Sequence, residues 1–427
     1  MNTRLRWVLL QIARRLWFRA TAFSVLGVAT ALFAGVARRY IPADIPGKIG
    51  AEAVDALLSI LATSMLSVTI FSLSTLVAAH ASATNHATPR ATRLLSQDHT
   101  AQNALSTFVG AFLFSLVGLI ALQSGLYSNG GLVVIYVATL AVIVLIVVTL
   151  LRWIDHVLRL GRVGETADRV EETAARAMRD RHEYPFLGGY PYPAEDQMPS
   201  DTTPVYADRM GYVQHVDMSA LHDLTRSGAV KVFVRSAPGA YVHPGRPLAL
   251  LHGFMVEGDI DRARAAFNVG DTRSFDQDPR FGTAVLAEIA SRALSPAVND
   301  PGTAIDVLGR AARLMSIWTE PRERAGEGPK FPFVHVPETT VGELFDDLFT
   351  PIGRDGASMV EIGIRLQKTL QVLAGLGDRR YAVAALACSR LALERAEHAL
   401  AIEADRQRVR SAAADVERIA SAYIEPK

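Results

Sequence analysis

The largest deficit in this sequence is of charge. Between residues 100 and 151 there is no Asp, Glu, Lys or Arg, and shorter charge-free runs cover residues 20–37 and 56–79. A membrane-spanning helix needs about 20 apolar residues, so the longest run is long enough for two crossings. Its break at Ser128-Asn129-Gly130-Gly131 predicts the turn of a helical hairpin. The runs exclude a wholly water-soluble chain and predict four transmembrane helices within residues 1–151.

Cysteine is also nearly absent. The single residue, Cys388, excludes an internal disulfide and any metal site that needs several cysteines. Its neighbours are mostly Ala and Leu on a predicted helix, so we interpret it as a small core residue rather than a reactive thiol. The net charge of +1 gives no indication of nucleic-acid binding.

Catalytic signatures are missing too. The sequence has no nucleophile elbow, no Walker loop, no paired-histidine zinc helix and no Gly-x-Gly-x-x-Gly fingerprint. Four histidines gather in one region, but their spacing fits no standard metal motif; they are His215, His222, His243 and His252. We therefore expect neither an enzyme nor a metal or cofactor site.

Arginine is distributed unevenly around the apolar runs. Five arginines precede the first run, Arg90 and Arg93 separate the second from the third, and Arg152 follows the last. Positive residues stay on the cytoplasmic side, which places both termini there. The first run is longer than the apolar part of a signal peptide, about 7–15 residues, so we expect it to stay uncleaved. The sequence predicts a multi-pass protein of the bacterial inner membrane.

Residues after the last run have ordinary soluble composition. We expect a helical stalk and Pro-rich linker at 152–204, a small β-rich domain at 205–258 and a mainly helical domain at 259–427. Strands are predicted at 211–217, 230–236 and 330–336, and one helix at 218–227. Further helices are predicted at 280–293, 301–317, 341–348, 357–376 and 378–420. The fold class is a membrane protein, mainly α, with a cytoplasmic α+β domain.

Two Pro-Gly turns between residues 238 and 251 give the β-rich domain a rhythm similar to the barrel-sandwich hybrid of biotinyl and lipoyl domains. Those domains carry a modified lysine at a hairpin tip. Lys231 lies inside a predicted strand instead, so no cofactor is inferred.

The second apolar run carries hydroxyl side chains on one half of its predicted helix, among them Ser59, Thr63, Ser67 and Ser74. They could line a water-filled pore, or they could allow close helix packing. Glu52 and Asp55 precede the run, as pore-mouth residues or as ordinary capping residues. No ionisable side chain lies in the middle of any run, which argues against a proton-coupled carrier.

Polar residues also concentrate between 267 and 303. Asp276, Asp278 and Arg280 surround Pro279, and Asn299 and Asp300 precede Pro301. An acidic or amide side chain followed by proline is typical of a helix N-cap. The alternative is that these helix starts form a binding site for a polar or anionic ligand.

Several blocks together resemble a known family. They are the Ser/Thr-rich stretch from Met65 to Ser74, Val-Arg-Ser-Ala-Pro-Gly-Ala-Tyr-Val, Arg273-Ser-Phe-Asp-Gln-Asp-Pro-Arg-Phe-Gly, and Ala293-Leu-Ser-Pro-Ala-Val-Asn-Asp-Pro. The chain resembles the bacterial predicted membrane proteins catalogued as domain of unknown function 2254. The resemblance implies an inner-membrane location and no established activity.

Two functions remain open at this point. The first is a homo-oligomeric channel whose partners are the lipid bilayer and other copies of the chain, with a cytoplasmic vestibule or gate and an unidentified ion or solute. The alternative is a membrane-anchored sensor that binds a ligand without transporting it.

Overall fold

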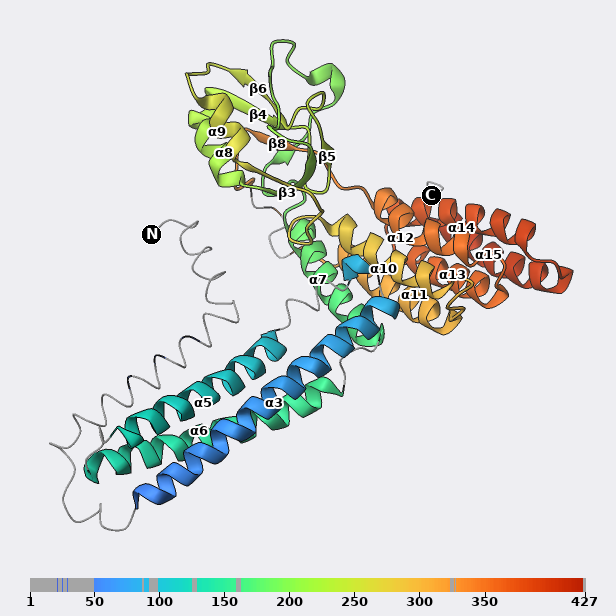
Figure 1. Cartoon of the computed structure of the whole chain (residues 1–427). Coiled ribbons are helices and arrows are strands. Elements are labelled where there is room, and N and C mark those ends of the chain that lie inside the picture. Colours follow the sequence, from blue (N-terminus) through green and yellow to red (C-terminus); the bar gives the residue numbers. More distant parts are fainter. Residues whose placement is uncertain are drawn as a thin grey trace. The chain divides into compact units, whose positions relative to one another are not determined.

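The chain forms two compact units in a computed structural model (Figure 1). The structure describes residues 50–86, 88–91, 99–124, 129–158, 163–322 and 328–424, with isolated positions at 21, 25, 29 and 326. The first of the two units, which we call the membrane unit, comprises Met1–Asn85 and Thr92–Glu165. The second unit comprises His86–Ala91 and Thr166–Lys427. The predicted span at residues 20–37 lies outside the described residues, apart from three positions.

The membrane unit contains three long helices, α3 (Ala51–His86), α5 (His99–Gln123) and α6 (Asn129–Val157). Within the described part of the chain, three stretches are long and apolar enough to cross a membrane: Ala51–Ala79, Thr100–Gln123 and Gly131–Val157. The predicted turn at residues 128–131 is wrong in detail. Because α6 begins at Asn129, both glycines belong to its first turn.

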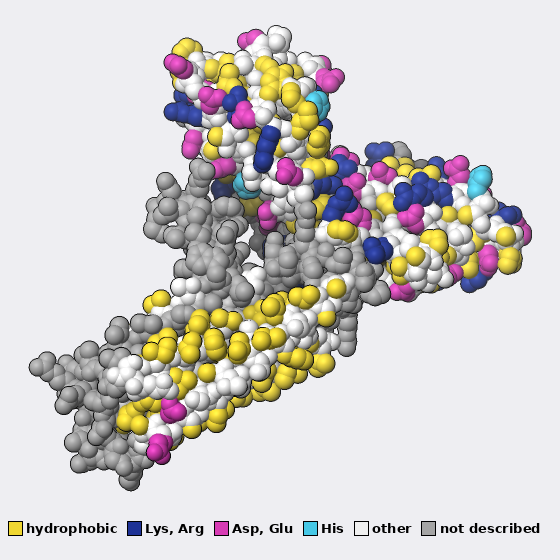
Figure 2. Space-filling view, viewed as in Figure 1, with side chains coloured by type: hydrophobic (Ala, Val, Ile, Leu, Met, Phe, Trp, Pro, Cys, Tyr) yellow, Lys and Arg dark blue, Asp and Glu magenta, His cyan; other side chains and the backbone are white. Residues whose placement is uncertain are grey.

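The three helices carry apolar side chains on both their packed and their exposed faces. Leu58 of α3 is fully buried and lies in one cluster with Phe114 of α5 and Ile135 of α6. Gly118 of α5 permits this approach, since a Cβ there would lie 3.1 Å from Leu58 Cδ1. Figure 2 shows apolar side chains covering much of the visible outer surface of these helices. Helices that are apolar all round are typical of a lipid environment.

The second unit begins with α7 (Val163–Glu183), most of which belongs to it. The helix predicted as part of a stalk packs within the second unit, where α7 contacts α10 (Pro279–Ala293). A Cβ on Gly282 would lie 2.3 Å from Ala174 Cβ, so the contact depends on the missing side chain. Arg310 strengthens the attachment by hydrogen-bonding Asp168 and Glu171 of α7, at 2.5 and 2.8 Å.

The β part holds two small sheets. Their strands are β1 (Tyr190–Pro191), β2 (Thr203–Val205), β3 (Gly211–Val216), β4 (Val230–Val234), β5 (Tyr241–Val242), β6 (Ala249–Gly253), β7 (Phe267–Gly270) and β8 (Val334–Val336). One sheet has the order β1-β8-β4-β6-β2, with β8 parallel to both neighbours, and the other has β5-β3-β7. Two short helices, α8 (Met218–Leu224) and α9 (Asp259–Ala265), complete this part.

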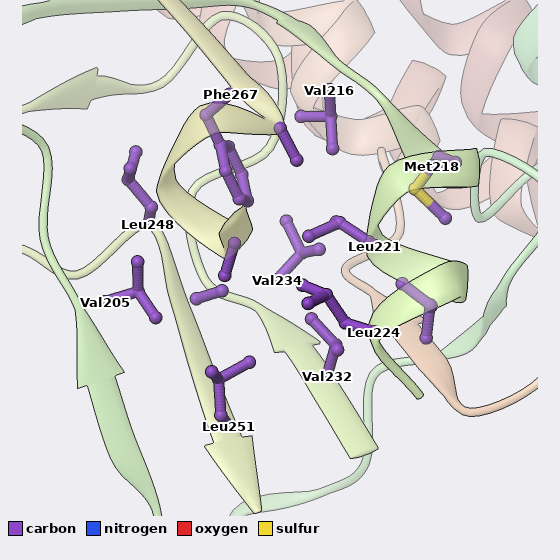
Figure 3. Packing of buried hydrophobic residues seen from close by; sticks show 14 of the residues in the cluster. Val205, Val216, Met218, Leu221, Leu224, Val232, Val234, Leu248, Leu251 and Phe267 are labelled. Atoms are coloured by element: carbon purple, nitrogen blue, oxygen red, sulfur yellow. The ribbon is translucent and has the colours of Figure 1, made fainter. Parts of the chain in front are cut away.

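The core of the β part joins both sheets and both short helices. Figure 3 shows Leu221 and Leu224 of α8 pointing toward Val232 and Val234 of β4. Phe267 of β7 closes the other side of the same cluster. The structure places strands outside the predicted β-rich segment 205–258 as well. β1 and most of β2 lie in the predicted linker, β7 lies in the part predicted to be mainly helical, and β8 lies within the strand predicted at 330–336. The barrel-sandwich hybrid stays a resemblance of the sequence.

The helical part comprises α10, α11 (Pro301–Ser316), α12 (Val341–Asp355), α13 (Val360–Ala374), α14 (Arg379–Ala399) and α15 (Glu403–Ile424). The predicted helices at 280–293 and 301–317 match α10 and α11 closely. The single helix predicted at 378–420 is wrong, because the chain leaves helical geometry at Leu400. Leu400 is buried, and its carbonyl accepts a hydrogen bond from Arg406 Nε at 2.7 Å.

Candidate functional site

Four hydroxyl side chains of α3 form what we call the hydroxyl face: Ser59, Thr63, Ser67 and Ser74. At about 100° per residue they fall within an arc of about 80°. The buried residues Leu61 and Met65, which contact α5 and α6, lie on the opposite side of the helix. Three of the four are exposed and Ser59 is half-buried. Packing against α5 and α6 therefore does not account for the hydroxyl face.

The hydroxyl groups of this face bond to their own helix. Thr63 Oγ1 donates to the Ser59 carbonyl at 3.0 Å, and Ser67 Oγ donates to the Thr63 carbonyl at 3.1 Å. Ser74 Oγ does the same with Ile70 at 2.9 Å. Such i−4 bonds satisfy a hydroxyl donor where no water is present. They make the face compatible with lipid as well as with water.

The predicted pore-mouth residues lie where α3 begins. Glu52 is exposed in the first turn, and Asp55 is half-buried one turn later. Carboxylates at this end of a helix interact favourably with its dipole. Glu52 also lies on the same side of α3 as the hydroxyl face, by helical spacing.

A cavity in the second unit brings together side chains that the sequence did not connect. Its volume is about 510 Å³. It lies between the last turn of α7, the junction of β3 and α8, and the segments around residues 276 and 330. The charged or polar lining includes Asp180, Arg181, His215, Asp217, Ser219, Asp276 and Lys330. Of the predicted ligand-binding residues, Asp276 lines this cavity.

Arg181 is the most buried charged residue in the lining, with 3% of its surface exposed. Its Nη1 donates to Thr339 Oγ1 at 3.1 Å, and its Nη2 donates to the Gln277 carbonyl at 2.9 Å. Among the described residues, its Nε has no hydrogen-bond partner. Burial lowers the pKa of Arg181 to about 10, although the charge of Asp278 acts in the opposite direction.

Asp278 is predicted correctly as a cap, and it does more. Its carboxylate accepts from the Phe281 backbone at 3.2 Å at the start of α10. It also accepts from Arg273 Nε at 2.7 Å and Nη2 at 3.0 Å. Burial raises the pKa of this carboxyl, against the lowering effect of Arg273. Gly239, at φ +91°, lies against it, since a Cβ there would be 2.2 Å from Asp278 Oδ2.

The segment between Asp276 and Arg280 is held on both sides. The Gln277 side chain accepts from the Val216 backbone N–H at 2.9 Å and so fixes the segment to β3. Asp276 is exposed and accepts from Ser274 Oγ at 2.8 Å. Arg280 points elsewhere: its Nε and Nη2 donate to Asp347 of α12 at 2.6 and 3.1 Å. Arg280 thus links α10 to α12 by hydrogen bonds.

The other predicted pair lies outside the lining of this cavity. Asp300 caps α11 by accepting from the backbone and hydroxyl of Thr303, at 3.1 and 2.6 Å. Asn299 is exposed and adopts φ +51° just before it. The capping interpretation is confirmed for Asp278 and Asp300, and the start of α11 does not line the cavity beside Arg181.

Two of the four histidines that the sequence singles out contact polar groups distant in sequence. His222 Nδ1 lies 3.2 Å from the Pro332 carbonyl oxygen, and His252 Nδ1 lies 3.0 Å from Asp201 Oδ1. Within the described ranges, no three His, Cys, Asp or Glu side chains form a group that could hold a metal. Cys388 is half-buried, and burial raises its pKa to about 12, which keeps it a thiol.

Sequence reasoning missed Arg181, Gln277 and Lys330. Arg181 belongs to a strongly charged helix that contains three other arginines. Only its burial by Thr339 and Gln277, both distant in sequence, distinguishes it. The block at 273–282 was singled out, and its contact with Gly239 joins two of the blocks that carry the family resemblance.

Comparison with known proteins agrees with this resemblance. A family model described as "Predicted membrane protein (DUF2254)" matches residues 13–372. Similar relatives include an uncharacterized protein of Mycobacterium bovis and one of Mycobacterium tuberculosis. Each is 26% identical over 254 residues, which is 56% of this chain and 48% of the relative.

The chain thus spans about half the length of the curated relatives it matches. No solved structure matches it. The family match covers most of the chain, and three apolar helices agree with its description. The chain therefore belongs to the family of predicted membrane proteins defined by domain of unknown function 2254.

Proposed function

We propose that the protein is a homo-oligomeric channel of the bacterial inner membrane, with the hydroxyl face of α3 lining the pore. The observation that carries the proposal is the position of this face, opposite the side of α3 that packs on α5 and α6. One helix cannot enclose water, so several copies must contribute one α3 each. The second unit would then form a cytoplasmic vestibule or gate, with both termini on that side.

The composition of α3 favours a channel over a coupled carrier. Residues 56–79 contain no Asp, Glu, Lys, Arg or His. Carriers that couple to protons place an ionisable group within the membrane, because the proton needs a relay. Hydroxyls without such a group are suited to passive conduction of a hydrated ion or polar solute.

Thiol accessibility tests the pore. In a Cys388→Ala background, Thr63→Cys and Ser67→Cys should react with a charged, membrane-impermeant thiol reagent in native membranes. The matched control is Val144→Cys on α6, since Val144 is 63% exposed in the chain and is expected to face lipid. Leu61→Cys serves as the buried control.

Conductance provides the second readout. Purified protein in planar bilayers should conduct, and modification of Thr63→Cys should reduce the current. Equal protection at Thr63, Ser67 and Val144 would place the hydroxyl face in lipid and remove the pore proposal. A monomer in mild detergent, confirmed by cross-linking in membranes, would remove it as well.

The second candidate function is ligand sensing by the second unit, with the membrane unit as an anchor. The specific observation in its favour is the cavity lined by Arg181 and Asp276. Its test is a metabolite screen by thermal shift on the full chain in detergent. The full chain is needed because α7 contributes Asp168 and Glu171 to the packing of the second unit.

A further inference from the structure

Arg181 is a buried cation without a carboxylate in contact. Among the residues that the structure describes, no Asp or Glu oxygen lies within the 4.0 Å of an ion pair with its guanidinium. Its two hydrogen-bond acceptors, Thr339 Oγ1 and the Gln277 carbonyl, are both neutral. A buried charge is costly unless it is paired, so an unpaired one beside a cavity calls for a counter-ion.

Asp278, whose charge acts on Arg181, is hydrogen-bonded to other donors. Asp278 accepts two hydrogen bonds from Arg273 and one from the Phe281 backbone. Gly239 also lies close to this carboxylate. Two guanidinium groups therefore share the field of one carboxylate, and the buried cluster keeps an excess positive charge.

The cavity wall beside Arg181 offers an apolar surface. Met218 and Phe331 line it together with Leu187 and Tyr184. A volume of about 510 Å³ falls within the range of about 300–1,000 Å³ that is common for small-molecule sites. Lys330 is exposed at the same cavity and adds a second positive charge.

The acidic lining residues restrict the charge of the occupant. Asp217 is committed to the start of α8, where it accepts from Ser219 Oγ at 2.6 Å and from the Ala220 backbone at 3.1 Å. Asp180 and Asp276 also line the cavity. Their repulsion disfavours a polyanion.

We propose that this cavity binds a small organic carboxylate with an apolar body, with the Arg181 guanidinium as its counter-ion and Lys330 at the entrance. Guanidinium and carboxylate match in geometry and charge. The inference holds whether the second unit gates a pore or acts as a sensor, and it does not depend on conduction.

Binding is measured on the full chain in detergent at constant ionic strength, by thermal shift and by calorimetric titration. The probes are phenylpropionate, hexanoate and succinate, with phenylpropanol and hexanol as neutral controls of matched shape. At least one monocarboxylate should bind at millimolar concentration or better, and the alcohols and succinate should bind more weakly. The proposal is overturned if no carboxylate binds, or if an alcohol binds as tightly as its acid.

Variants assign the site. Arg181→Gln should weaken carboxylate binding by about 10- to 100-fold, as expected for loss of a hydrogen-bonded charge. Lys330→Met should weaken it by about two- to fivefold. Ser219→Trp should block the cavity, and Arg354→Gln, which alters an exposed arginine paired with Asp355, should change nothing.

If Arg181→Gln fails to fold, Lys330→Met and Ser219→Trp test whether the carboxylate binds in this cavity. Unchanged binding in both would place the site elsewhere and overturn the assignment. Conductance measured on the same proteins stays a separate result, so failure of the carboxylate site and failure of the channel are distinguishable.

Discussion

Arg310 and Arg181 are both buried, with 7% and 3% of their surfaces exposed, but their surroundings differ. Arg310 contacts three carboxylates, those of Asp168, Glu171 and Asp306. Arg181 contacts only neutral acceptors. We predict that Arg310→Met destabilises the fold by about 2 kcal/mol, because it removes charge-assisted hydrogen bonds to three partly exposed carboxylates. Arg181→Met should lower the free energy of unfolding by less than about 1 kcal/mol. The variant loses two hydrogen bonds to neutral acceptors, but it also removes an unpaired buried charge.

Thermal unfolding of both variants in the same detergent measures the difference. The result that contradicts the prediction is an equal or larger loss in Arg181→Met. That outcome would make Arg181 a structural residue and weaken the case for a missing counter-ion.

Asp300 provides a test at one exposed cap. Asp300→Ala should lower the free energy of unfolding by about 1 kcal/mol, because Thr303 loses its capping acceptor. Asp300→Asn should lower it by less. Hydrogen bonds from Thr303 lower the pKa of Asp300 in the folded chain. The extra stability of the charged cap is therefore present above the unfolded pKa, about 3.9, and is lost as the pH falls through the lower folded value.

Denaturant unfolding of the wild type and Asp300→Ala at pH 7 and at pH 3 checks this. The difference in unfolding free energy between the wild type and Asp300→Ala should be smaller at pH 3 than at pH 7. A constant gap would show that the carboxylate charge is not what stabilises the start of α11.

At this scale the sequence predicts caps well and the cavity badly. An acidic residue before proline predicts Asp278 and Asp300 as caps, because the signal is local. The burial of Arg181 depends on Thr339 and Gln277, which are far away in the chain, so no local pattern reports it.

Among the elements, the packing of α7 on α10 depends on one glycine. Gly282→Ala should destabilise the second unit, because the added Cβ would meet Ala174 Cβ at 2.3 Å. Gly342→Ala in α12 is the matched control, since nothing lies within 4 Å of its added Cβ. That control should be neutral or should stabilise by up to about 1 kcal/mol.

Limited proteolysis between α6 and α7, together with thermal unfolding, measures the effect. Cleavage between α6 and α7 should become faster in Gly282→Ala and stay unchanged in Gly342→Ala. Identical behaviour of the two variants would mean that α7 is not held by this contact.

Element boundaries depend on where local signals are strong. Proline after a capping residue locates the starts of α10 and α11 to within one residue. No glycine or proline marks the bend at Leu400, which is stabilised by Arg406, so α14 and α15 look like one helix in sequence. Strand β7 was missed because its Phe-Asn-Val-Gly is short, and its pairing with β3 is a tertiary contact.

For the whole molecule, topology is the strongest prediction. A reporter fused after Gly164 should be active as a cytoplasmic marker, and one inserted near Pro46 as a periplasmic marker, because of the arginine distribution. Paired cytoplasmic and periplasmic reporters at each position provide the measurement. A periplasmic Gly164 fusion would reverse the assignment of the second unit.

Composition predicts the membrane part because lipid imposes one rule along its whole length: helices without charge. The three described spans match the charge-free runs for that reason. No comparable rule constrains the second unit. The strands of its β part lie between residues 190 and 336, and several helices lie between them in the sequence. Its domain boundaries could not be predicted from changes in composition.

The internal hydrogen bonds of α3 have an electrostatic consequence for any pore built on it. A hydroxyl has one proton and two lone pairs. Thr63, Ser67 and Ser74 each give that proton to a carbonyl of their own helix, so only lone pairs remain to face outward. A ring of such oxygens can replace water around a cation, whereas an anion finds no donor there. The wall of such a pore would therefore favour a cation over an anion without carrying a single charge.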